Sequence, residues 1–373
     1  MAMWIFILWT IIAFLWACIV YLGFKLPRLF GFMTGIGELK QLLLGIAITL
    51  ALMGILFLCF NIANAIICII YLGLIWATSD FFFWFIQKFF GLSFEYYYAG
   101  WVAIIITVIS LSIGWYLNFN VWQTNYSLKT DKKIPDLKIA MIADSHLGTT
   151  FDGNGFAKHI ETISSQNPDL LVIVGDFVDD DTKKEDMVKA CEALGNLQTK
   201  YGVYLVFGNH DKGYYGFRGF TADDLVKELS KNNVKVLKDD VVEFDDFYLI
   251  GRKDYSETHE RCGNRQTMSE LVENLDKDKY MIVLDHQPTD YKNQVKSEVD
   301  LVLSGHTHGG QLFPFNWVGR WIGANDMTYG HKKQNKTDFI VTSGISDWAI
   351  KFKTGTKSEY VIIDVKSLFT NTK

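Results

Sequence analysis

Four long apolar stretches lie within the first 120 of the 373 residues, and they limit the possible folds of this chain more than any other feature. A helix of about 20 apolar residues can cross a bilayer, and a backbone in lipid must satisfy its hydrogen bonds within its own segment. We therefore predict four transmembrane helices, at residues 3–24, 41–60, 62–78 and 101–119. Residues 1–120 then form an all-α, four-helix transmembrane domain.

The stretch between the third and fourth apolar segments, residues 79–100, is rich in Phe and Trp. Aromatic rings favour the headgroup boundary of a bilayer, so we expect an interfacial helix here; the alternative is that the stretch lengthens the third span. Asp80 and Lys88 do not lie clearly inside a predicted span. The ionisable groups that transporters often carry within the membrane are therefore missing, which disfavours a transporter.

Basic residues are scarce in this region, and they fall in two of the loops. The first loop holds Lys25, Arg28 and Lys40, and the third holds Lys88. Because basic loops tend to stay in the cytoplasm, we predict a multi-pass protein of the cell membrane with loops one and three inside. Both chain ends, and the hydrophilic part that follows, are then extracellular.

The net charge argues against one class of partner. The formal charge of −5 divides into +1 for residues 1–120 and −6 for the remainder. Proteins that bind nucleic acid usually present a basic surface, and no dense block of Lys and Arg occurs here. We therefore expect no nucleic-acid binding, and name the lipid bilayer as a partner.

The hydrophilic part has the pattern of an α/β domain. Residues 121–135 are polar and end at Pro135, so we interpret them as a linker, with the domain at 136–373. Short runs of Val, Ile and Leu alternate with polar stretches of helical character, which is typical of sheets covered on both faces. We predict strands at residues 137–143, 170–174, 203–207, 247–250, 280–284 and 301–303, and helices at residues 155–166, 185–199, 222–232 and 267–276.

Five polar blocks follow directly after predicted strands. They begin at Asp144, Gly175, Gly208, Asp285 and Ser304, and together they contain five of the eight histidines. Ligands in open α/β sheets gather beyond the carboxyl ends of strands, so these blocks can converge although they are far apart in sequence. Glycines within three of the blocks are expected to permit tight turns.

The order of these blocks resembles that of the calcineurin-like metallophosphoesterase superfamily. The blocks are Asp144-Ser145-His146, Gly175-Asp176-Phe177-Val178-Asp179, Gly208-Asn209-His210-Asp211, His286-Gln287-Pro288 and Gly305-His306-Thr307-His308. The run from Ser304 to Pro314 is similar to bacterial, membrane-associated members of the YkuE type. The resemblance implies a layered α/β/β/α sandwich and a metal-dependent phosphohydrolase.

The resemblance also implies a set of metal ligands. One metal would be bound by Asp144, His146, Asp176 and His308, and the other by Asp176, Asn209, His286 and His306. Imidazole, carboxylate and amide ligands suit two divalent ions such as Mn, Fe or Zn. Two such ions can activate water for attack on a phosphoester without a covalent protein nucleophile.

His210 matches the family's non-ligand histidine, and Asp179 matches the carboxylate that orients it. In this interpretation His210 protonates the leaving oxygen, which is general acid catalysis. The alternative function is a sensor that binds a phosphorylated ligand without turnover and signals through its membrane helices. Because a pure binder has no need of such an acid, His210 favours the hydrolase.

Two features bear on the substrate. Asp180-Asp181 stand where the protein serine/threonine phosphatase branch has Arg-Gly, which disfavours phosphoprotein substrates. An aromatic cluster at residues 313–322 follows the last histidine block, and such clusters near a bilayer tend to lie at its interface. It favours a phosphodiester or a lipid-linked diphosphate as substrate; the alternative is that the cluster covers the core of the domain.

Overall fold

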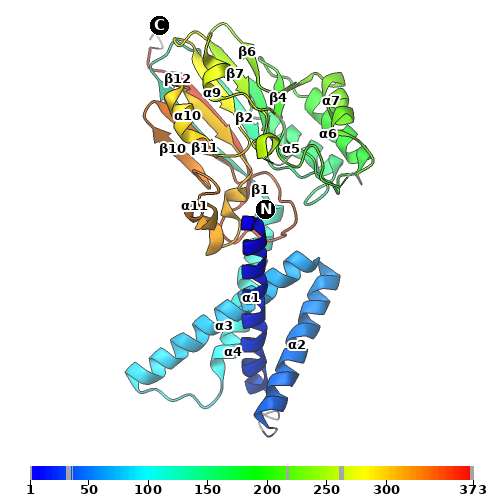
Figure 1. Ribbon diagram of the computed structural model, residues 1–373, viewed down its shortest axis with the longest axis vertical. Coiled ribbons are helices and arrows are strands. Elements are labelled where there is room, and N and C mark those ends of the chain that lie inside the picture. The colour runs from blue at the N-terminus through cyan, green and yellow to red at the C-terminus, as the bar shows by residue number, and fades with distance from the viewer. Residues whose placement is uncertain (1, 31–34, 36, 216–217, 260–263, 370–373) are drawn as a thin grey trace. The chain divides into compact units, whose positions relative to one another are not determined.

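The computed structural model describes residues 2–30, 35, 37–215, 218–259 and 264–369. The chain divides into two compact units, Met1–Trp115 and Tyr116–Lys373, and each is described by itself. The first unit is helical and the second contains both sheets (Figure 1).

The first unit consists of α1 (Ala2–Lys25), a 3-10 turn (Leu26–Leu29), α2 (Glu38–Cys59), α3 (Ile62–Phe90) and the greater part of α4 (Tyr98–Phe119). In the described part of the chain, four helices are long and apolar enough to cross a membrane. Asn61 starts α3 as an N-cap, because its side chain accepts a hydrogen bond from the Asn64 backbone N–H at 2.8 Å. Gly91 ends the helix in the left-handed conformation that favours glycine.

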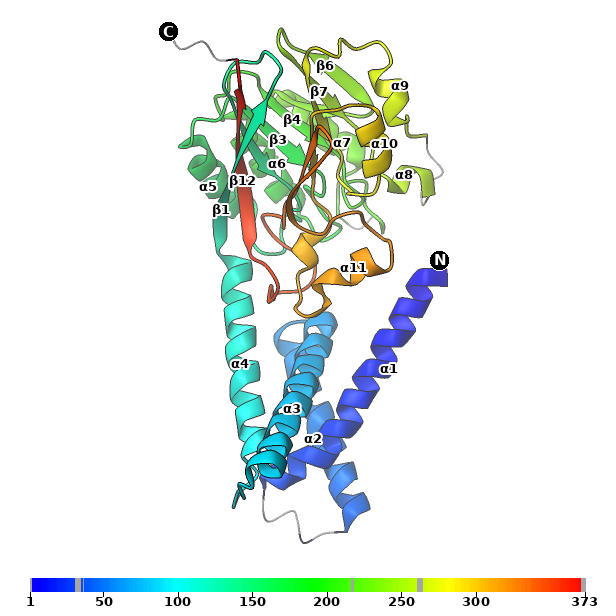
Figure 2. The same cartoon turned by 90° about the vertical axis from the view of Figure 1, so that its left-hand side faces the viewer.

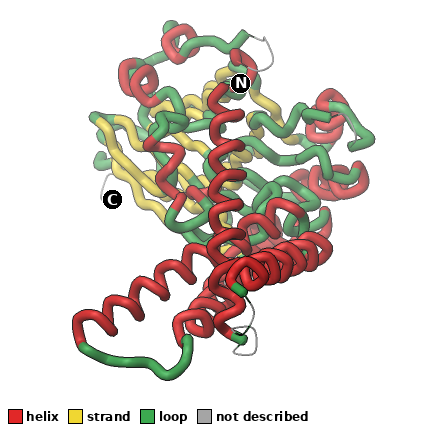
Figure 3. Tube along the Cα trace, turned by 60° about the horizontal axis from the view of Figure 1, so that its bottom comes forward, coloured by secondary structure: helices red, strands yellow, loops and turns green. Residues whose placement is uncertain are grey.

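The prediction of a separate interfacial helix at residues 79–100 is wrong. The third helix continues without a break to Phe90, and residues 91–97 form the loop before α4, which Figure 3 draws in green. The alternative, a longer third span, is what the structure shows. Asp80 and Lys88 therefore lie inside a candidate span, so ionisable groups are present there, contrary to the prediction.

The second unit contains two six-stranded sheets. The first has the strand order β1-β12-β2-β3-β4-β5; β12 and β2 pair antiparallel, and the other described neighbours pair in parallel. Its strands are β1 (Val121–Thr130), β2 (Leu137–Ile142), β3 (Leu170–Val174), β4 (Val203–Val206), β5 (Val234–Leu237) and β12 (Ser358–Ser367).

The second sheet has the order β10-β11-β9-β8-β7-β6, parallel except at its two edges. Its strands are β6 (Asp240–Glu243), β7 (Phe247–Gly251), β8 (Tyr280–Leu284), β9 (Leu301–Ser304), β10 (Gly330–Gln334) and β11 (Thr337–Val341). The six predicted strands correspond to β2, β3, β4, β7, β8 and β9.

Three apolar cores show that this unit has four layers. The central core joins the two sheets face to face, with Met141 and Val172 from the first and Leu249 and Ile282 from the second. A second core packs α5 (Gly153–Ser164), α6 (Lys184–Gly195) and α7 (Ala222–Lys231) on the outer face of the first sheet. A third packs α9 (Met268–Val272) and α10 (Tyr291–Lys296) on the second sheet. The predicted α/β/β/α sandwich is confirmed (Figure 1).

Residues 121–130 are not a linker. They form β1, an edge strand that leads on from α4 and pairs in parallel with the whole of β12 (Figure 2). The segment is polar because most of its side chains are exposed or half-buried at the edge of the sheet, a position where polar residues are normal. Only residues 131–136 connect β1 to β2.

Candidate metal centre

The loops that follow β2, β3, β4, β8 and β9 bring the five polar blocks together. These strands are parallel within each sheet, so their carboxyl ends lie at one edge. In the described residues, there are three groups of side chains whose ligand atoms lie within 4.8 Å of one another, and two of the groups share His146. The groups are Asp144 with His146 and His308, Asp176 with His286 and His306, and His146 with Asp179 and His210.

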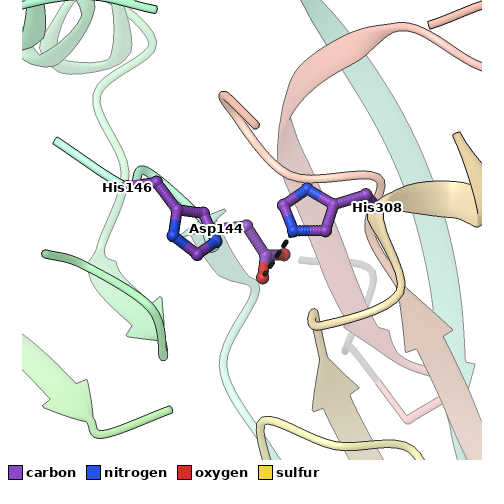
Figure 4. A group of neighbouring side chains, drawn as sticks. All are labelled: Asp144, His146 and His308. Atoms are coloured by element: carbon purple, nitrogen blue, oxygen red, sulfur yellow. Dashed lines mark ion pairs between the residues drawn. The ribbon is translucent and has the colours of Figure 1, made fainter. Parts of the chain in front are cut away.

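The first group lies at the ends of β2 and β9 (Figure 4). His308 Nε2 is 4.0 Å from Asp144 Oδ1, and the imidazole rings of His146 and His308 are stacked with centroids 5.2 Å apart. Asp144 also accepts the His306 backbone N–H at 2.9 Å and 3.0 Å, which connects this group to the second.

The second group surrounds Asp176. His286 Nε2 lies 3.1 Å from Asp176 Oδ2, while the opposite ring nitrogen, Nδ1, lies 2.8 Å from the Val174 carbonyl. A hydrogen bond from Nδ1–H to this carbonyl fixes the tautomer that presents the Nε2 lone pair to the site. His146 Nε2 lies 3.6 Å from the same oxygen of Asp176, so this carboxylate stands between the first two groups.

The residues on either side of Asn209, Gly208 and His210, approach the second group. The backbone N–H of His210 donates to Asp176 Oδ1 at 2.9 Å, and a Cβ added to Gly208 would be 2.2 Å from that oxygen. The side-chain amide nitrogen of Asn209 donates to Tyr214 Oη at 3.1 Å. The loop after β4 therefore approaches Asp176 closely with its backbone.

The donor set fits divalent cations. His146 Nε2 and His286 Nε2 are buried and make no hydrogen bond in the described structure, although each is directed at a carboxylate. Buried polar atoms normally have a partner, and an imidazole lone pair facing carboxylate oxygens is the donor arrangement of Zn, Mn or Fe sites. The residues present therefore suit two metal ions.

Backbone strain accompanies the site. Five of its residues have positive φ, a conformation rarely adopted by side chains other than glycine and one that clusters at functional sites. They are Asp144, His146, Asp176, His306 and His308, with φ between 35° and 69°. The surrounding structure must stabilise these conformations.

Glycine is required at three positions of the blocks for different structural reasons. Gly175 has φ of 81°, as the predicted tight turn requires. Gly208 and Gly305 have no positive φ; a Cβ at either position would overlap the carboxylate of Asp176 or Asp144, at 2.2 Å and 2.6 Å. For these two, close approach of the backbone to a carboxylate is the reason for glycine.

The third group places two histidines on one carboxylate. His146 Nδ1 lies 2.9 Å from Asp179 Oδ2, and His210 Nδ1 lies 3.0 Å from Asp179 Oδ1. Burial alone would raise the pKa of Asp179, but these hydrogen bonds and the imidazole charges hold it well below its usual value. Burial alone would lower the pKa of His210, but the Asp179 hydrogen bond and the charges of Asp176 and Asp179 raise it to about 9.

Two of the ligand-type histidines have lowered pKa values. Burial lowers the pKa of His306 to about 4 and that of His308 to about 3, so both imidazoles are neutral at physiological pH. Asp176 and His286 form a coupled pair. Their mutual attraction outweighs the effect of burial, lowering the pKa of the carboxyl and raising that of the imidazole.

Sequence reasoning gave no role to Asp211, although it ends the third block. Its buried carboxylate accepts four backbone N–H groups, from Asp176, Phe177, Val178 and Gly208, at 2.7–3.0 Å. It thereby connects the loop after β3 to the loop after β4. Its position next to His210 in the third block is the sequence feature that could have indicated this role.

Asp347 and Lys353 were also missed. Asp347 Oδ1 lies 3.0 Å from His308 Nδ1, and its other oxygen lies 3.8 Å from Lys353 Nζ. Both side chains are fully buried, and burial raises the pKa of Asp347 to about 7. Nothing in the local sequence indicated these contacts, because both residues lie more than 35 positions beyond His308.

The aromatic cluster at residues 313–322 is exposed, which contradicts the alternative that it covers the domain core. Trp317 is 55% and Trp321 74% exposed, and Phe313, Phe315 and Ile322 are also exposed. Arg218, in the loop between β4 and α7, is buried and donates to the Asp211 carbonyl at 2.6 Å.

Comparison with known proteins agrees with the site. A family model described as calcineurin-like phosphoesterase matches residues 137–310, which contain all five blocks. The chain is 35% identical over 246 residues to an uncharacterized metallophosphoesterase of Aquifex aeolicus, covering 65% of this chain and 90% of that protein.

Two further relatives bear on the predicted branch. The chain is 32% identical to the uncharacterized metallophosphoesterase Cj0846 of Campylobacter jejuni, over 66% of this chain and 65% of that protein. It is 28% identical to the uncharacterized metallophosphoesterase YkuE of Bacillus subtilis, over 62% of this chain and 79% of that protein. The chain thus spans less than two thirds of the Campylobacter protein's length.

Proposed function

The chain belongs to the calcineurin-like phosphoesterase family, and on that premise we propose that it is a membrane-anchored phosphohydrolase that uses two divalent metal ions to activate water. The observation that carries the proposal is the convergence of the two ligand groups on Asp176, which His146 and His286 both face. The carboxylate of Asp179 contacts both His146 and His210, so the His210–Asp179 pair is connected to this site. The substrate we propose is a phosphodiester or a lipid-linked diphosphate.

The ligand assignment follows the two groups. Asp144, His146, Asp176 and His308 would hold one ion, and Asp176, Asn209, His286 and His306 would hold the other. When bound, the two ions supply Lewis-acid polarisation of the phosphoryl group and lower the pKa of water. The side chains keep those positions through His286 Nδ1 on the Val174 carbonyl and His308 Nδ1 beside Asp347.

His210 is proposed as the general acid. Its Nδ1 is held by Asp179 at 3.0 Å, so Nε2–H is the group that can transfer a proton to the leaving oxygen. Asp179 acts as a positioning residue, since it fixes the ring and favours its protonated form. A sensor without turnover has no use for an acid held in this way, which supports the hydrolase over the sensor.

The exposed aromatic cluster supports a lipid-linked substrate. It begins only five residues after His308, and large exposed apolar side chains are a common feature of surfaces that meet lipid. The four candidate spans would place the whole chain at a membrane.

We propose the cell membrane as the location and an extracellular site as the orientation. The proposal rests on four basic residues at or near the helix ends that border loops one and three, Lys25, Arg28, Lys40 and Lys88. A cysteine introduced near Asp131 should react with a membrane-impermeant thiol reagent in intact cells. Reaction only after lysis would reverse the orientation.

The test of the function uses the full chain, purified in detergent and loaded with Mn, against lipid diphosphates, nucleotide-linked lipids and generic phosphodiesters. We expect hydrolysis with loss of activity after chelation, and a preference for a lipid-bearing substrate. Replacing Trp317 and Trp321 by Ala should reduce turnover of that substrate while p-nitrophenyl phosphodiester hydrolysis persists.

Trp122→Ala, at an exposed tryptophan on β1, is the matched control and should change neither activity. Equal loss on both substrates in the double variant would refute the lipid contact. A metal-loaded protein that binds phosphorylated lipids but hydrolyses none of the panel would favour the sensor.

A further inference from the structure

A pocket in the first unit lies at the carboxyl end of α1 and is separate from the candidate metal centre. It encloses about 420 Å³ and is lined by side chains from α1, the 3-10 turn, α3 and the loop before α4. The residues that matter for its chemistry are Lys25, Arg28, Asp80, Phe81, Trp84 and Tyr97. Volumes of this size are typical of small-molecule sites.

One wall of the pocket is a fixed polar network around Asp80. Its carboxylate receives hydrogen bonds from Tyr21 Oη and Tyr97 Oη, both at 2.6 Å, and an ion pair from Lys25 Nζ at 2.5 Å. Trp76 Nε1 in turn donates to Tyr97 Oη at 2.7 Å. A charge inside a candidate span is costly unless it is paired, and here three donors satisfy it.

The network leaves the pocket with an excess of positive charge. Asp80 compensates Lys25, whereas Arg28 is exposed and takes part in no ion pair in the described structure. Its guanidinium lies on the 3-10 turn directly after α1 and lines the same space. A planar guanidinium with five N–H donors suits phosphate oxygens, which it can bind in a bidentate manner.

Another wall of the pocket is apolar. Phe81 and Trp84 are 62% and 48% exposed, and their rings contact each other with centroids 5.6 Å apart. They provide a surface for hydrocarbon beside the cationic group. A ligand that satisfies both walls carries an anionic phosphate and an apolar portion.

We propose that this pocket binds the phosphate headgroup of an anionic phospholipid, with its acyl chains lying on the exposed aromatic side chains of α3. The bilayer around the candidate spans supplies such lipids at high local concentration, and anionic headgroups attract basic side chains near the membrane surface. The proposal concerns the membrane unit and does not depend on hydrolysis at the metal centre.

The test measures binding of water-soluble, short-chain lipids to the delipidated full chain in detergent by native mass spectrometry. The probes are dihexanoyl phosphatidylglycerol, dihexanoyl phosphatidylcholine and inorganic phosphate. We expect phosphatidylglycerol to bind at least about tenfold more tightly than the other two, since only it offers both a net negative phosphate and acyl chains.

Arg28→Gln should weaken phosphatidylglycerol binding about tenfold, because a charge-assisted hydrogen bond is lost. Arg28→Lys keeps the charge without the planar fork and should have an intermediate effect. Lys40→Gln, at an exposed position of α2 that does not line the pocket, is the matched control and should change binding less than about twofold.

Three results would overturn the proposal. Equal binding of inorganic phosphate would make this a simple anion site without a lipid. If phosphatidylcholine bound as tightly as phosphatidylglycerol, the negative charge of the headgroup would have no role. If Lys40→Gln weakened binding as much as Arg28→Gln, the effect of charge would be non-specific attraction. Arg28 is exposed, so its variants should fold, and size-exclusion profiles matching the wild type verify this.

Discussion

Lys353 offers the sharpest test of how the metal centre is supported. Its fully buried Nζ donates to the carbonyls of Ser343, Gly344 and Ser346 at 2.8, 3.4 and 3.0 Å, and lies 3.8 Å from Asp347. Burial lowers the pKa of the Lys353 ammonium, although the carboxylates of Asp347, Asp144 and Glu359 favour the charged form. Lys353→Met keeps an unbranched side chain, one heavy atom shorter, while it removes the charge and every donor.

The expected loss of stability follows from this geometry. Removing one partner of a buried ion pair costs about 3–5 kcal/mol, since the other charge is left uncompensated. For a unit of this size, about 1 kcal/mol corresponds to a Tm change of roughly 2–4 °C, so we expect a decrease of roughly 6–20 °C. The lower end is favoured because the pKa of Asp347 is already raised to about 7, and without Lys353 the carboxyl can take up a proton.

The same change should weaken the metal centre. Asp347 contacts His308 Nδ1 at 3.0 Å, and a protonated Asp347 would hold that imidazole less firmly. Changes to groups that orient metal ligands typically lower metal affinity about 10- to 100-fold. Calorimetry measures both quantities on the full chain in detergent, as a thermal scan and as a Mn titration.

Lys366→Met, at an exposed position of β12, is the matched control and should leave both values unchanged. Combining Lys353→Met with Asp347→Asn removes both charges, so the double variant should lose less stability than the two single losses added together. A Tm of Lys353→Met within 2 °C of wild type, or strictly additive losses, would refute the reasoning.

Four further predictions concern the chemistry. His210→Gln should lower kcat about 10²- to 10⁴-fold with unchanged metal content, measured by steady-state kinetics and elemental analysis; loss of metal would instead make His210 a ligand. The raised pKa of His210 predicts that kcat falls as pH rises through about 9 and that the variant lacks this limb. The sign for stability is the same: a raised folded pKa stabilises the protein fully below about 6.5 and no longer above about 9. Activity should also fall below about pH 6, where protons compete with metal for imidazole; a flat profile from pH 5 to 8 would contradict this. Dialysis against a chelator should abolish hydrolysis and lower the Tm, and Mn should restore both, whereas a Tm indifferent to metal would argue against the ligand assignment.

Local patterns were sufficient to predict much of the fold. Runs of Val, Ile and Leu predicted β2, β3, β4, β7, β8 and β9 because a strand covered on both faces must be apolar along its length. The polar blocks after those runs predicted which side chains would converge, because parallel strands end at one edge. Their roles as metal ligands stay predictions.

Other features depended on tertiary structure. The local sequence of Val121–Thr130 predicts a polar linker, but the segment is a strand because it pairs with β12, more than 230 positions away. The local sequence places Asp80 just beyond the third span. In the structure it lies within the third helix, where Tyr21, Lys25 and Tyr97 bind its carboxylate.

The sequence by itself determined where six of the strands lie, which polar side chains follow five of them and which helices could cross a membrane. These properties depend on residues close together in the chain. Only the tertiary structure decided that Asp347 contacts His308 and that Lys353 contacts Asp347. A buried charge is tolerated only beside a compensating group, and which groups become neighbours depends on how distant segments pack.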